Sequence, residues 1–176
     1  MSEGFASMIK LRLLKLDYSW IAKDVVQSFS EMRWLSWKGC PTQFTPTNPT
    51  KLVVLDLSYS DITESWMGWK YIKVAKSLKV INLTSCHKLS RTPNLSENLQ
   101  LEVLILKSCY RLTAFDKSIG DLKRLVILNL QHCDNLTYLP NNICPLICNL
   151  KSVSNSSLAP DLEVETSDDD SVSSGR

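Results

Sequence analysis

Six cysteines and two histidines are the side chains of this 176-residue chain that most invite a chemical role. Cys86 stands directly before His87, and Cys133 stands directly after His132. Thiolates and imidazoles are preferred ligands of zinc, and a thiol beside an imidazole could also form a nucleophile with its base. The two pairs therefore raise a metal site and a cysteine nucleophile as hypotheses.

A recurring phrase accounts for four of these cysteines in structural terms. The phrase is L-x-x-L-x-L followed by two residues and then Cys or Ser, and its copies are spaced by 20 to 26 residues. The copies begin at Leu11, Met32, Leu52, Leu78, Leu101 and Leu125 and end at Ser19, Cys40, Ser60, Cys86, Cys109 and Cys133. Buried cysteines behave as small apolar residues, and adjacent side chains in a turn diverge, so we expect structural thiols and no shared ion.

The other two cysteines suggest no further chemistry. Cys144 and Cys148 lie in C-P-L-I-C, whose spacing differs from the C-x-x-C redox motif, and a disulfide is disfavoured in a reducing compartment. The chain also contains no G-x-x-x-x-G-K, no G-x-G-x-x-G and no H-E-x-x-H. We therefore expect no catalysis, no cofactor and no metal site.

The period and the phrase predict an α/β leucine-rich-repeat solenoid, with short parallel β-strands on the concave face and loops and short helical turns on the convex face. Alternate strand residues face opposite sides, so Ile81 and Leu83 should point into the core while Val80, Asn82 and Thr84 point out. The returns are short and rich in Pro, Asn and Ser; the longest, residues 66–77, could hold a helical turn or two.

Composition divides the chain into three parts. Residues 1–10 are expected to cap the first coil, residues 11–153 to form about six repeats, and residues 154–176 to be a disordered, acidic, Ser-rich tail. Residues 152–176 carry six acidic groups and one arginine. After Val153 the phrase loses its second strand leucine, since Asn155 stands in that position.

Charge and hydropathy patterning bear on location and partners. The chain has no apolar stretch long enough to span a bilayer, and its first residues lack the basic start and apolar run of a secretory signal. We therefore expect a cytoplasmic or nucleocytoplasmic chain without a membrane partner. The net charge is +2 and the basic residues are dispersed, which also disfavours nucleic acid as a partner.

Several segments resemble one family closely. They are WMG at 66–68, LKVINLTSCHKLSRTPNLS at 78–96, LEVLILKSCYRL at 101–112, SIGDL at 118–122 and LTYLP at 136–140. Together with FASMIKLRLL at 5–14 and MRWLSWKGCP at 32–41, they resemble the repeats of plant intracellular immune receptors, the disease-resistance proteins that join a TIR domain, a nucleotide-binding domain and leucine-rich repeats. The resemblance covers residues 4–153.

This resemblance implies a function and a missing part. The family's NAD-cleaving TIR domain and ADP- or ATP-binding switch domain would lie upstream, so we expect a truncated receptor that carries the first repeats. Its implied role is non-catalytic: recognition of a pathogen effector or a guarded host protein, and restraint of the switch domain until recognition. A free-standing adaptor that assembles signalling proteins is the alternative. The sequence predicts no oligomeric state.

The outward strand residues are the expected partner-binding surface, because solenoids of this kind bind on the concave face. The candidates are Trp34, Ser36, Lys38, Asp56, Ser58, Tyr59, Asn82, Thr84, Ile105, Lys107, Asn129 and Gln131. A flanking column of apolar residues, Leu13, Trp34, Val54, Val80, Val103 and Ile127, is either partly covered by turns or part of an interface. The sharper hypothesis is that Trp34 and Tyr59 anchor a partner or the switch domain.

Overall fold

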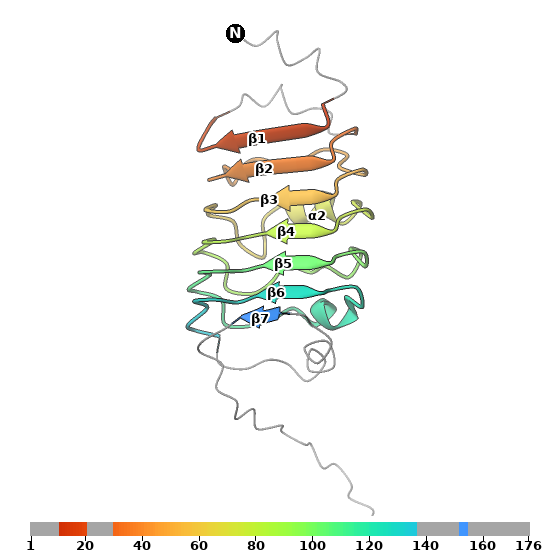
Figure 1. Ribbon diagram of the computed structural model, residues 1–176. Coiled ribbons are helices and arrows are strands. Elements are labelled where there is room, and N and C mark those ends of the chain that lie inside the picture. Colours follow the sequence, from red (N-terminus) through yellow and green to blue (C-terminus); the bar gives the residue numbers. More distant parts are fainter. Residues whose placement is uncertain (1–10, 21–29, 137–151, 155–176) are drawn as a thin grey trace, which may run out of the picture.

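One seven-stranded parallel sheet organises the molecule, with its strands in chain order from β1 to β7. The computed structural model describes residues 11–20, 30–136 and 152–154. The strands are β1 (Leu13–Asp17), β2 (Trp34–Lys38), β3 (Val54–Asp56), β4 (Val80–Asn82), β5 (Val103–Ile105), β6 (Ile127–Asn129) and β7 (Ser152–Ser154). Figure 1 shows them stacked as one ladder, each directly below its predecessor. The predicted solenoid is confirmed.

Strand register follows the repeat phrase. The second aliphatic position of each copy pairs with its equivalent in the next, which gives the row Leu14, Leu35, Leu55, Ile81, Leu104 and Leu128. The last five of these side chains are buried, because coil stacked on coil encloses them. Val153 of β7 pairs with Leu128. The sheet therefore continues beyond the six copies of the phrase, into the segment in which Asn155 replaces the second strand leucine.

The core contains the spaced aliphatic positions, the cysteine column and apolar residues of the convex returns, such as Trp66 and Phe115. The first residue of each phrase is fully buried or nearly so in Met32, Leu52, Leu78, Leu101 and Leu125. Leu11, Leu14 and Leu16 in the first described coil are only partly buried against this core. Burial of one such side chain contributes about 1.5–3 kcal/mol, so the row is a large source of stability.

Within the described residues, the convex side carries two short helical elements. Helix α2 (Gly68–Ile72) lies in the long return, where the sequence predicts a helical turn or two, and Figure 1 shows it behind β3 and β4. The 3-10 helix η2 (Lys117–Asp121) begins after Asp116, whose carboxylate accepts a hydrogen bond from Ser118 N. The amide of Asn98, from the following repeat, donates to Ile72 O and Ala75 O at the end of α2.

Two predicted parts of the chain lie outside the described residues. These are the N-terminal cap at residues 1–10 and nearly all of the tail at residues 154–176; β7 includes Ser154. Cys144 and Cys148 also lie outside the described residues.

Candidate functional site: the concave face and the strand-end turns

The cysteine column is structural. Cys40, Cys86, Cys109 and Cys133 are all buried free thiols. The Sγ atoms of Cys86, Cys109 and Cys133 donate to Leu57 O, Leu83 O and Leu106 O, each in the preceding coil, at 3.3, 3.2 and 3.1 Å. Each thiol thus links its turn to a carbonyl group of the preceding coil; Leu83 O and Leu106 O also accept from the backbone N–H groups of Cys86 and Cys109.

Burial also makes these thiols unreactive. Desolvation raises the pKa of Cys86 to about 12 and that of Cys133 to about 11, and it raises the pKa of Cys40 and Cys109 as well. The thiolate is the form that attacks and binds metals, so the nucleophile hypothesis loses its reactive species. His87 and His132 are exposed while their neighbouring cysteines are buried, so the pairs diverge as expected. Within residues 11–20, 30–136 and 152–154, no group of three His, Cys, Asp or Glu could hold a metal ion.

The residues between the second and third aliphatic positions of each phrase form the central column of the concave face. Several of them hydrogen-bond to the following turn and are also partly exposed to solvent. Asp56, Asn82 and Asn129 each accept a hydrogen bond at 3.0 Å from the backbone N–H two residues on, which belongs to Ser58, Thr84 and Gln131 respectively. Such a bond fixes the direction of the chain as the strand ends. All three side chains stay partly exposed, as does Ile105 between them.

Ser36 and Ser58 do not belong to an open surface. Their exposed fractions are 5% and 2%, so they offer a partner almost no contact area. The hydroxyl of Ser36 donates to the Asp56 carboxylate at 3.1 Å, and this pairing draws the serine into the sheet. The structure therefore removes these two serines from the contact surface proposed for the concave face, because their small side chains lie below their neighbours.

A second polar column contains the residue two positions after each member of the central column, and several of its side chains are long. Lys38, Thr84, Lys107 and Gln131 are partly exposed. Lys38 lies 3.9 Å from the Asp17 carboxylate, an exposed pair of small energetic weight. The column therefore offers mixed donors and acceptors that a protein partner could use.

Solvent exposure varies along the apolar flanking column. Val54, Val80 and Val103 are half-buried in the middle of the sheet, whereas Leu13, Trp34 and Ile127 are 58%, 46% and 37% exposed. Neighbouring coils cover the centre of the column and its ends are open, so an interface on this column stays a prediction for the exposed ends alone. Trp34 is the first residue of β2, whereas Tyr59 follows the end of β3, so these two residues lie at opposite ends of the strands and do not form one patch.

The turns after the strands form a second surface, which the sequence interpretation did not identify. The residue before each Cys or Ser of the phrase has a left-handed backbone, at Tyr18, Gly39, Tyr59, Ser85, Ser108 and His132. Parallel hydrogen bonds tie these turns together, such as Tyr18 N to Lys38 O at 2.9 Å and Tyr59 N to Thr84 O at 2.7 Å. Two bulky tyrosines at a position that favours glycine were the sequence signal for this surface.

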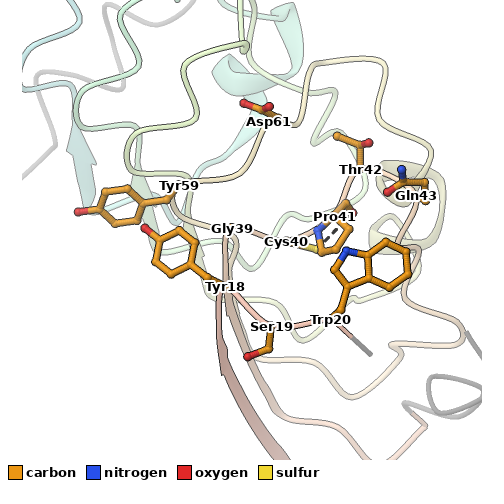
Figure 2. A pocket seen from close by; sticks show the side chains of 10 residues that line it. All are labelled: Tyr18, Ser19, Trp20, Gly39, Cys40, Pro41, Thr42, Gln43, Tyr59 and Asp61. Carbon is orange, nitrogen blue, oxygen red and sulfur yellow. Dashed lines mark hydrogen bonds between the residues drawn. The ribbon is translucent and has the colours of Figure 1, made fainter. Parts of the chain in front are cut away.

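A pocket of about 420 Å³ opens among the first three of these turns (Figure 2). Figure 2 shows Tyr18 and Tyr59 side by side at one end and Trp20 at the other, with the backbone of Gly39 and Cys40 between them. The two tyrosine rings are 6.3 Å apart between centroids and tilted by 53°. Thr42, Gln43 and Asp61 complete the rim.

No helix among the described residues has the length and apolar character needed to cross a membrane.

No family model matches the chain. Among curated proteins it is similar to disease resistance protein RPP2A of Arabidopsis thaliana, at 31% identity over 149 residues, covering 79% of this chain and 11% of that protein. It is also similar to disease resistance protein RPV1 of Vitis rotundifolia, at 35% identity over 153 residues, covering 70% and 11%. The chain spans about a tenth of the length of these relatives.

A solved structure supports the same fold. The leucine-rich repeat domain of the type III effector XopL matches with a TM-score of 0.60 and 20% identity, covering 88% of this chain and 56% of that one. At this identity the likeness concerns the fold alone. The relatives confirm the resemblance drawn from the sequence motifs, and the solved structure agrees with the fold: this chain is a leucine-rich-repeat solenoid whose sequence is similar to plant disease-resistance proteins.

Proposed function

We propose that this chain is a non-catalytic protein-recognition module of an intracellular plant immune receptor. It recognises a pathogen effector or a guarded host protein through the concave face, and in a receptor it restrains the nucleotide-binding switch domain. The cytoplasm is the matching location. The relatives support the defence role, since they are disease-resistance proteins.

The exposed part of the concave face carries the proposal. Trp34 supplies a large aromatic surface, Ile105 an apolar one, and Lys38, Lys107 and Gln131 polar groups. Aromatic side chains supply much of the binding energy in protein interfaces, and varied polar neighbours supply specificity. The inward positions, by contrast, are uniformly apolar and are used by the core.

The test is binding of the full chain to a nucleotide-binding switch domain of the receptor type that the resemblance implies. The double variant Trp34→Ala, Lys107→Glu should weaken binding about tenfold or more, because it removes an aromatic anchor and reverses a charge. Tyr110→Ser is the matched control: Tyr110 is 45% exposed, but it lies on a strand-end turn and not on the concave face. Equal affinity for the double variant and the wild-type chain would refute the proposed use of this face.

A further inference from the structure

The aromatic pocket at the strand ends is separate from the concave face and has its own chemistry. Three of the residues that line it are aromatic and have large exposed fractions: Trp20 80%, Tyr18 69% and Tyr59 50%. These rings lie outside the buried core, which contains none of the three residues. Their placement therefore needs another explanation.

Both tyrosines occupy a turn position with a left-handed backbone. Tyr18 and Tyr59 have φ values of 50° and 61°, in the left-handed region that side chains with a β-carbon occupy at a cost of about 1–2 kcal/mol. Gly39 takes the same position in the intervening repeat, with φ 64°. A Cβ atom on Gly39 would lie 2.5 Å from Tyr18 Cδ1, so only glycine lets the Tyr18 ring lie across this turn toward Tyr59.

The polar ends of the rings are hydrogen-bond donors directed to solvent. The indole N–H groups of Trp37, Trp66 and Trp69 all donate to backbone carbonyls of the chain. Among the described residues, the Trp20 indole and the hydroxyls of Tyr18 and Tyr59 have no such acceptor. The site thus combines aromatic faces with unused donors.

Charge contributes little to the pocket. Asp61, the carboxylate on its rim, is paired with Lys88 at 2.8 Å. Because this carboxylate already has a partner, it offers a ligand little net charge, and the aromatic rings and their donors dominate the site. A ligand with flat apolar groups and spare acceptors is well matched.

We propose that this pocket binds a proline-rich segment of a partner protein in the polyproline II conformation. Proline rings pack on aromatic side chains, and aromatic-lined grooves are the usual receptors of such segments. The backbone of a polyproline II helix has no internal hydrogen bonds, so its carbonyls are free to accept from Tyr18, Trp20 and Tyr59. Proline has no N–H group, so the ligand requires no acceptor from the pocket.

The experiment is a titration of the full chain, labelled with ¹⁵N, with unlabelled decaproline, followed by the indole N–H resonance of Trp20. We expect a saturable shift of that resonance, and Tyr59→Gly should weaken binding about tenfold or more, as loss of an aromatic anchor does. Tyr59→Gly places in this turn the residue that its neighbour Gly39 already has, so the melting temperature should be kept or raised. Loss of binding could then not be attributed to unfolding.

Two control variants separate the effect of the aromatic ring from effects of the turn backbone and of the concave face. Ser108→Gly makes the same backbone change two turns away, where φ is 58°, and should leave decaproline affinity within about twofold of wild type. Trp34→Ala on the concave face should also leave it unchanged while weakening binding to the switch domain. This difference separates failure of the pocket from failure of the proposed recognition face.

Three results would overturn the inference. One is no shift of the Trp20 resonance at millimolar decaproline. Another is an equal shift with a Gly-Ser peptide of ten residues, which has the carbonyls but not the rings. The third is a tighter response to cellohexaose, which would identify the pocket as a glycan site.

Discussion

At the scale of single residues, adjacent positions of one strand have opposite roles. Leu104 is fully buried in β5, whereas Ile105, the next residue, is partly exposed on the concave face. This follows from strand geometry, in which successive side chains alternate between faces. Similar apolar residues at 104 and 105 therefore differ greatly in what they contribute to stability.

Leu104→Ala should lower the free energy of unfolding by about 2–5 kcal/mol, because it removes buried contacts and leaves a cavity. Ile105→Ala is the matched control and should cost no more than about 1 kcal/mol. Urea unfolding followed by circular dichroism measures both. Equal losses would mean that the alternation of faces in β5 is wrong.

The buried thiols make stability depend on alkaline pH. Burial raises the pKa of Cys86 to about 12 in the folded chain, whereas an unfolded cysteine titrates near about 8.5. Above that lower value the unfolded state has lost a proton that the folded state keeps. The stability that this group contributes is therefore complete below about pH 8.5 and is lost as the pH rises toward 12.

Between pH 8 and pH 10 the buried Cys86 should thus remove about 2 kcal/mol of unfolding free energy. The Cys86→Ala variant should show a correspondingly smaller decrease, as measured by urea unfolding in the presence of a reductant. Identical pH profiles for the two proteins would contradict the assigned burial of this thiol.

At the scale of elements, each coil depends on its neighbour for hydrogen bonding. Helix α2 is too short to be stable alone, and its end is satisfied by Asn98 from the next coil, whose Nδ2 lies 3.1 Å from Ile72 O and 3.2 Å from Ala75 O. The Nε1 atom of Trp66 similarly donates to Thr42 O and Phe44 O in the preceding return. The convex elements are therefore held by contacts between coils.

Asn98→Ala should cost about 1–3 kcal/mol, because two carbonyls at the end of α2 lose a buried donor. The control is Asn94→Ala in the same return: the Asn94 side chain is partly exposed, and it accepts a hydrogen bond only from its near neighbour Ser96. Thermal unfolding compares the two variants. A smaller loss for Asn98→Ala than for Asn94→Ala would exclude this capping role.

At the scale of the whole molecule, a solenoid has stability that varies from coil to coil, since each repeat contacts only its neighbours. The inward residues Leu14 and Leu16 of β1 are partly buried, whereas Ile81 and Leu104 of β4 and β5 are fully buried. Local opening should therefore be easier at β1 than at the centre of the sheet.

Hydrogen exchange should show this gradient. Amides of β1 should exchange at least about tenfold faster than those of β4 and β5, which corresponds to ~1.4 kcal/mol in opening free energy. Mass spectrometry of peptic fragments of the full chain resolves these strands. Uniform protection from β1 to β5 would indicate a single cooperative unit.

Spacing along the chain was sufficient to predict which side chains face the core. The aliphatic positions recur at a fixed period, and only a stack of parallel strands lets all of them share one interior, so Leu55, Ile81 and Leu104 had to align. The same phase placed the cysteines inside and the outward columns on the concave face.

The properties of the outward surface depended on tertiary structure. The sequence treats Ser36 and Asn82 alike, yet the serine is buried and donates to a neighbouring carboxylate while the asparagine stays partly exposed. It could not show that Tyr18 and Tyr59, forty-one positions apart, lie beside one another across Gly39. The core is specified by a period that repeats within the sequence, whereas exposure and pockets arise from the particular side chains that stacking brings together.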